Sequence, residues 1–246
     1  MRAQQPSVSV WPDAPSLADA VSERLLSSLR HAQEARGEAC VVLTGGGIGI
    51  AVLDAVRRSP RRDSVDWARV TVWWGDERFV DAADTDRNEL QARRALLDHL
   101  DLPPDRIHPM PAADGPAGAD VDGAAARYAQ ELGEPAFDVL LLGMGSEGHT
   151  ASIFPATPAV REQRTVFAVR DCPKPPPTRV SLGFAALNAA REVWLIVTGA
   201  EKAPAVAAAI AGADPWDLPA AGVRGRERTH WLLDAAAAQS LAPDLS

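Results

Sequence analysis

The chain has 246 residues, of which 46% are hydrophobic and 24% charged, and this balance excludes a largely disordered or fibrous protein. Acidic residues outnumber basic ones by 33 to 25, for a formal net charge of −8, so we expect neither nucleic acid nor an anionic membrane surface as a partner. No apolar run approaches the roughly 20 residues that span a bilayer, and the N-terminus lacks a signal-peptide core. The expected location is the cytoplasm.

Short β-branched and apolar runs alternate with helical patterns along the chain. The predicted strands are Ser7–Trp11, Ala39–Leu43, Val70–Trp74, Phe137–Leu142, Thr165–Val169, Glu192–Val197 and His230–Leu233. The predicted helices are Leu17–Ala35, Ile48–Arg57, Asn88–Leu100, Ala119–Leu132, Ala200–Ile210 and Ala235–Leu241. Ser16, with Asp19 three positions later, indicates the start of the first helix. The continuous apolar run Val139–Leu142 is typical of a strand buried on both faces. We therefore expect one α/β domain over residues 1–246, with a Rossmann-like open, mostly parallel sheet flanked by helices.

Four predicted strands end in glycine-rich or charged turns. These turns are Thr44–Gly47, Gly75–Arg78, Gly143–His149 and Thr198–Lys202. In an open parallel sheet, ligands bind beyond the carboxyl ends of the strands, so the four turns are expected to border one crevice.

Two of the turns offer positive charge to an anion. In Thr44–Gly47 the glycines let backbone N–H groups approach a phosphate, and the next helix presents its positive end; a tight turn without a ligand explains the same residues equally well. Lys202, one of only two lysines in the chain, could bring a cation to the same anion or could be a solvated surface residue.

His149 is the only histidine within a glycine-rich turn after a predicted strand. Its side chain titrates near neutrality and could act as a general base. The same turn matches the dinucleotide-binding pattern G-x-G-x-x-G, but Pro155 and Pro158 interrupt the helix which that pattern requires. We therefore expect no cofactor. The chain also lacks a nucleophile elbow, a P-loop and zinc-ligand spacings, so no metal site is predicted.

Several segments resemble the 6-phosphogluconolactonase family, in order along nearly the whole chain. Gly143–Pro155 is similar to the family's G-x-G-x-D-G-H-T-A-S-L-F-P, and Trp74–Val80 to its W-G-D-E-R-x-V. Both motifs are long and specific. Weaker matches are Leu43–Gly47 with L-S-G-G-S, Asp86–Asn88 with D-S-N, Arg179–Leu182 with R-I/V-T/S-L, and Val197–Ala203 with V-x-G-x-x-K-A.

The resemblance implies the fold of the glucosamine-6-phosphate deaminases and ribose-5-phosphate isomerases. It also implies hydrolysis of 6-phospho-D-glucono-1,5-lactone, a step of the oxidative pentose phosphate pathway, without a covalent intermediate. His149 would activate water and then protonate the leaving ring oxygen, while Asp76 would orient the substrate hydroxyls or the base. The residues implied in holding the phosphosugar are Thr44, Gly45, Gly46, Arg78, Asn88, Arg179 and Lys202. The expected partner is this small molecule, for a monomer or small homo-oligomer.

The chain departs from the family pattern at two places. Glu147 replaces the aspartate that usually precedes Gly148 and His149; it keeps the charge but extends the reach, and we assign it no catalytic task. Gly47-Ile48-Gly49 replaces S-T-P, which removes a hydroxyl from the expected phosphate cradle and leaves Thr44 as the nearby one.

Two other functions have to be weighed against lactone hydrolysis. Glucosamine-6-phosphate deaminases share the fold, but their histidine turn reads G-H-I-A-F-N-E, ending in a glutamate that partners the histidine. Phe154 occupies that position here, and an apolar ring cannot polarise an imidazole. A non-catalytic phosphosugar-binding regulator would retain Gly45, Gly46 and Lys202 but would be free to lose the base, so the presence of both His149 and Asp76 argues against it.

Overall fold

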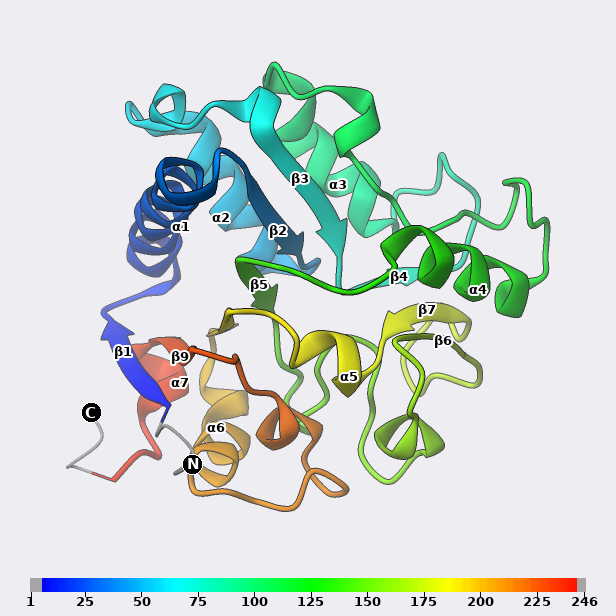
Figure 1. Ribbon diagram of the computed structural model, residues 1–246. Helices are drawn as coiled ribbons and strands as arrows, with labels where there is room; N and C mark the ends of the chain where they lie inside the picture. The colour runs from blue at the N-terminus through cyan, green and yellow to red at the C-terminus, as the bar shows by residue number, and fades with distance from the viewer. Residues whose placement is uncertain (1–5, 243–246) are drawn as a thin grey trace.

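The computed structural model describes residues 6–242, and six of the strands in this part form one parallel sheet (Figure 1). The order across the sheet is β1-β9-β8-β5-β2-β3, and every neighbouring pair is parallel. The strands are β1 (Ser7–Trp11), β2 (Ala39–Leu43), β3 (Val70–Trp74), β5 (Val139–Leu142), β8 (Glu192–Val197) and β9 (Arg228–Asp234). The predicted α/β class with a mostly parallel sheet is confirmed.

Helices cover both faces of this sheet because successive strand residues point to opposite sides. Val41 and Leu43 of β2 pack with α1 (Ala14–Arg36), α2 (Gly47–Arg58) and α3 (Asn88–Ala95) in one core. Val42, between them, belongs to the second core. The helices of the second core are α4 (Val121–Leu132), α5 (Phe184–Leu187), α6 (Ala203–Ile210) and α7 (Ala235–Ala238).

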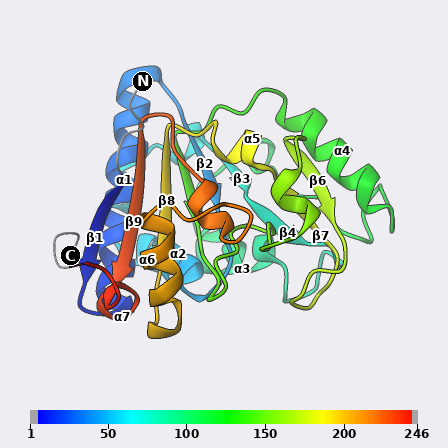
Figure 2. The ribbon, with the colours of Figure 1, turned by 90° about the horizontal axis from the view of Figure 1, so that it is seen from below.

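A second, antiparallel sheet lies beside the first, on the opposite side of the molecule from α1 (Figures 1 and 2). It has the order β4-β7-β6, from β4 (Asp76–Arg78), β7 (Arg179–Leu182) and β6 (Val166–Val169). Gly75 alone separates β3 from β4. Its N–H donates to Leu43 O of the main sheet at 3.1 Å, and its carbonyl accepts from Leu182 N of the small sheet at 2.9 Å. The chain thus passes from one sheet to the other through a single residue.

The sequence did not predict β4, β7 or α5, and the expected turn Gly75–Arg78 is largely a strand. The first helix also begins earlier than expected: Asp13, not Ser16, is its N-cap, with Ser16 N donating to Asp13 Oδ1 at 2.8 Å. The helix predicted over Ala200–Ile210 starts as a 3-10 turn and becomes α6 only at Ala203, one residue before Pro204.

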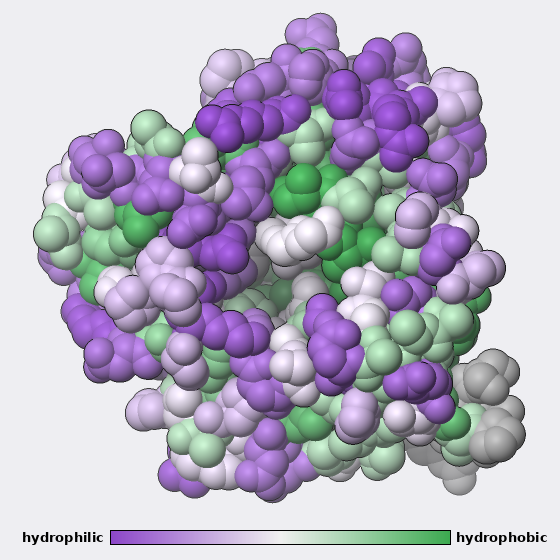
Figure 3. Space-filling view, turned by 180° about the vertical axis from the view of Figure 1, so that it is seen from behind, coloured by the Kyte–Doolittle hydropathy of each residue, from purple (hydrophilic) through white to green (hydrophobic). Residues whose placement is uncertain are grey.

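The other predicted elements are present. The strands Ser7–Trp11, Ala39–Leu43, Val70–Trp74 and Glu192–Val197 have the predicted bounds, and the remaining elements have shifted ends. The helix predicted to reach Leu100 stops at Ala95, since Leu96 has a non-helical backbone. Within residues 6–242, no helix is both long and apolar enough to cross a membrane. Seen from behind, hydrophilic residues cover much of the surface, and a hollow near its middle has hydrophobic residues mainly on one side and hydrophilic residues on the other (Figure 3). The expectation of a single domain stays a prediction.

Candidate active site

One cavity of about 510 Å³ opens beyond the carboxyl ends of the parallel strands. All four strand-end turns that the sequence singled out contribute to its wall. The predicted site residues found in the wall are Thr44, Gly45, Gly46, Asp76, Arg78, Asn88, His149, Arg179 and Lys202. The structure therefore brings together every residue that the sequence placed in the site.

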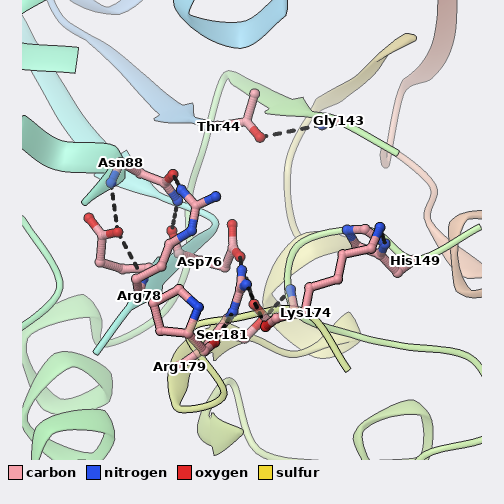
Figure 4. A network of polar contacts seen from close by, with 12 residues as sticks. Thr44, Asp76, Arg78, Asn88, Gly143, His149, Lys174, Arg179 and Ser181 are labelled. Atoms are coloured by element: carbon pink, nitrogen blue, oxygen red, sulfur yellow. Dashed lines mark hydrogen bonds and ion pairs between the residues drawn. The ribbon is translucent and has the colours of Figure 1, made fainter. Parts of the chain in front are cut away.

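The glycine turn after β2 leads directly into α2, whose first turn has no side-chain cap. Gly46 has φ 83°, which favours glycine. A Cβ on Gly45 would overlap the amide of Asn88, so the backbone here lies close to a side chain from α3. Thr44 Oγ1 accepts from Gly143 N at 3.3 Å and ties the ends of β2 and β5 together (Figure 4). The uncapped N-terminus of α2 offers free N–H groups to an anion in the cavity.

Glu77, which was not among the expected site residues, organises the part of the site formed by β4 and α3. Its buried carboxylate accepts from the backbone N–H groups of Arg78 at 2.8 Å, Asn88 at 2.7 Å and Glu89 at 2.8 Å. Burial raises the pKa of this carboxyl to about 7, although the Arg87 guanidinium and the three N–H groups oppose the rise. Glu77 thereby fixes β4 to the start of α3.

Arg78 and Asn88 are linked to each other and to Asp76 (Figure 4). Arg78 donates to Asn88 Oδ1, and Asn88 Nδ2 donates to Asp76 O at 2.8 Å. Arg78 forms no ion pair among residues 6–242, and Lys202, which lines the same cavity, forms none either. Two cations with no carboxylate partner thus face the same space as the glycine turn, an arrangement that suits a phosphate group.

Asp76 is buried beside this network and does not contact the histidine. Its Oδ2 accepts from Ser152 Oγ at 2.6 Å and lies 3.9 Å from Arg179 Nη1. Ser152 N in turn donates to Ser181 Oγ of β7 at 3.2 Å. Of the two tasks foreseen for Asp76, these contacts are compatible with orienting substrate hydroxyls rather than the base.

His149 stands on a turn of unusual backbone shape. Gly148 before it has φ 88°, and Gly145 N donates to His149 O at 3.0 Å. The imidazole stacks on Phe154, with ring centroids 4.3 Å apart and planes 20° from parallel. Its side chain is 18% exposed. Burial lowers the pKa of His149 below its ordinary value of 6.5, against the opposing effect of the Glu147 carboxylate, so the neutral ring persists to acidic pH.

Glu147 is the carboxylate partner of this imidazole. Its Oε1 lies 2.8 Å from His149 Nδ1, which fixes the ring and leaves Nε2 as the nitrogen able to accept a proton. Burial alone would raise the pKa of Glu147, but its backbone hydrogen bond, Lys174 and His149 lower it to about 2. Glu147 had no expected task, because two residues of separation across a glycine do not indicate this contact.

Lys174 and Arg179 line an adjoining pocket together with His149 (Figure 4). Lys174 Nζ lies 2.9 Å from Glu147 Oε1, a contact that the sequence did not predict. Arg179 lines the cavity as expected, but its Nε donates to Pro176 O at 3.1 Å and its Nη2 to Lys174 O at 3.1 Å. Most of its donors are therefore occupied by the proline-rich loop, which leaves Arg78 and Lys202 as the freer cations.

No cluster of three or more His, Cys, Asp or Glu side chains suited to a metal ion occurs within residues 6–242. What the cavity does contain is one neutral imidazole, the buried carboxylates of Asp76 and Asp234, and two unpaired cations around an uncapped helix N-terminus. This set can bind a phosphorylated polyol and activate water against an electrophilic carbon.

Comparison with known proteins agrees with this chemistry. The model of the family of glucosamine-6-phosphate isomerases and 6-phosphogluconolactonases matches residues 12–231, and the chain belongs to this family. Within it, a 6-phosphogluconolactonase of Streptomyces coelicolor is 51% identical, over 98% of this chain and 96% of its own. A 6-phosphogluconolactonase of Mycobacterium tuberculosis is also 51% identical, over 96% and 98%. The solved 6-phosphogluconolactonase of Trypanosoma brucei is 28% identical with a TM-score of 0.82, over 98% of this chain and all of that one.

Proposed function

We propose that the chain hydrolyses 6-phospho-D-glucono-1,5-lactone to 6-phospho-D-gluconate, the second step of the oxidative pentose phosphate pathway, in the cytoplasm. The observation that carries the proposal is His149, held through Nδ1 by Glu147, in a cavity that also holds the unpaired cations Arg78 and Lys202. The 6-phosphogluconolactonases at 51% identity support the same reaction.

In this mechanism Nε2 of His149 removes a proton from water as the oxygen attacks C1 of the lactone. The carbonyl becomes a tetrahedral oxyanion, the bond between C1 and the ring oxygen breaks, and the imidazolium returns its proton to that oxygen. Arg78, Lys202 and the N–H groups of Gly45 and Gly46 hold the phosphate, with Thr44 beside them. Asp76 and Asn88 orient the sugar hydroxyls, while Arg179 mainly supports the wall. Hydrolysis of a strained ester in this way needs no covalent intermediate.

The alternative function, deamination of glucosamine 6-phosphate, is less well supported. Phe154, at the position of the deaminase glutamate, stacks flat on the imidazole and supplies no charge. The carboxylate that does contact His149 is Glu147, which lies 2.8 Å from Nδ1 and leaves Nε2 to act on water. We therefore retain lactone hydrolysis as the proposed reaction.

A turnover assay with freshly generated lactone, corrected for spontaneous hydrolysis, tests the proposal. Glucosamine 6-phosphate is assayed in parallel for ammonia release. Rapid lactone loss without ammonia is the expected result. Ammonia release would favour the deaminase, and binding of 6-phosphogluconate without either reaction would favour a phosphosugar-binding regulator.

A further inference from the structure

Lys174 contacts both Glu147 and His149, although the proposed reaction assigns it no role. Its Nζ lies 2.9 Å from Oε1 and 3.1 Å from Oε2 of Glu147, and 3.5 Å from Nδ1 of His149. An ammonium has donors only, and Nδ1 already directs its proton to Glu147. The short approach of Lys174 to Nδ1 is therefore a charge contact and not a hydrogen bond.

The backbone of the loop that carries Lys174 is held by hydrogen bonds from Arg179. The guanidinium donates to three successive carbonyls, those of Lys174 at 3.1 Å, Pro175 at 3.2 Å and Pro176 at 3.1 Å. Cys172 N closes the loop by donating to Pro177 O at 2.9 Å. Three prolines in a row also restrict the backbone. The Lys174 side chain is 47% exposed, yet its backbone is held in place by the buried Arg179.

A carboxylate on Nδ1 has two effects on a general base. It fixes the ring and its tautomer, which helps catalysis, but it also favours the protonated imidazolium, which cannot accept a proton. A cation beside the same carboxylate preserves the first effect and offsets the second, because it repels the imidazolium while leaving the hydrogen bond intact.

We propose that Lys174, supported by Arg179, is a positioning residue that aligns Glu147 on His149 and keeps the imidazole unprotonated. The proposal rests on the proposed function for its activity readouts. Lys174 lowers the pKa of His149 and also that of Glu147, in keeping with this role. The other charged groups around the ring are Asp76, whose charge favours the imidazolium, and the cavity residues Arg78, Arg179, Glu201 and Lys202.

The test compares Lys174→Met with Lys174→Arg, which keeps the charge. The matched control is Arg170→Met, which removes an exposed cation paired with Asp122 away from the cavity. For each protein, kcat and kcat/KM on the lactone are measured from pH 5 to pH 8, and the ring of His149 is titrated by NMR. Lys174→Met is expected to raise the pH at which activity is half lost and to reduce activity at pH 5.5 severalfold more than at pH 8. Lys174→Arg and Arg170→Met are expected to keep the wild-type profile.

Two results would overturn the proposal. An unchanged acid limb and an unchanged His149 titration in Lys174→Met would show that the ammonium does not act on the base. A rise in KM alone, equal at all pH values, would make Lys174 a ligand of the substrate phosphate instead. If the wild-type protein does not hydrolyse the lactone, the proposed function fails separately, and the NMR titration still decides whether Lys174 controls His149.

Discussion

Replacing Glu147 by glutamine removes the charge of the group that contacts His149 Nδ1 but keeps its shape and one oxygen. A hydrogen bond to a charged group contributes about 1.5–3 kcal/mol. Glu147 is 36% exposed, so solvent screening favours the lower end of that range. Since about 1.4 kcal/mol corresponds to tenfold in rate, we expect Glu147→Gln to lose about tenfold in kcat/KM. Glu147→Ala, which also frees the ring, should lose up to about 100-fold, the upper end of the same range.

The pH dependence gives the same substitution a second readout. Glu147 raises the pKa of His149 against the larger effect of burial, so its neutralisation lowers that pKa further. Activity requires the neutral ring and is lost as the pH falls through its pKa. The acid limb of kcat/KM therefore moves to lower pH in Glu147→Gln, opposite to the shift expected for Lys174→Met.

The assay is initial lactone hydrolysis between pH 5 and pH 8, with circular dichroism to verify folding. Glu227→Gln is the control, because Glu227 forms an exposed ion pair with Arg191 outside the cavity. An acid limb that moves to higher pH, or a rate within twofold of wild type, would refute the assignment of Glu147 as the partner of His149.

Three further predictions concern the base and the wall. His149→Ala should lose most of the turnover while calorimetry still detects binding of 6-phosphogluconate; comparable turnover would refute the role of the base. In the wild-type enzyme, the pH at which kcat/KM falls to half of its maximum should lie below 6.5, because burial lowers the pKa of His149 from that value. A midpoint above pH 6.5 would contradict this. Glu77→Gln should cost about 1–3 kcal/mol of stability in urea unfolding, because it removes one of the two carboxylates beside the buried Arg87 and weakens the contacts with three backbone N–H groups. A loss below about 0.5 kcal/mol would show that these contacts are unimportant.

The main sheet and the site residues in the turns after its strands could be predicted from the sequence, because their sequence patterns are local. An apolar run followed by glycines, as in Val41–Gly47, indicates a buried strand, its end and an anion-binding turn within a few residues. The convergence of such turns then follows from parallel topology alone. His149 and Lys202 were therefore expected at the same cavity.

The small sheet and the contacts of Lys174 and Arg179 could not be predicted, because they depend on segments that are distant in the sequence. β4 is three charged residues with no apolar alternation, and it becomes a strand only by pairing with β7, about 100 residues away. Lys174 meets Glu147 because Arg179 fixes the proline-rich loop. Arg179 itself was expected to hold phosphate, but the carbonyls that occupy its donors belong to a loop whose shape the sequence does not reveal.

The passage through Gly75 gives two adjacent carboxylates separate tasks. Beyond Gly75 the chain is extended, so Asp76 and Arg78 face the cavity while Glu77 points the other way, toward Arg87 and the start of α3. Which of the residues Asp76, Glu77 and Arg78 faces the cavity is thus set by the alternation of side chains along the strand. Adding or deleting one residue before Asp76 would turn the longer carboxylate toward the substrate and the shorter one toward the interior. We therefore expect natural or engineered length changes to be excluded here, even where single substitutions are tolerated.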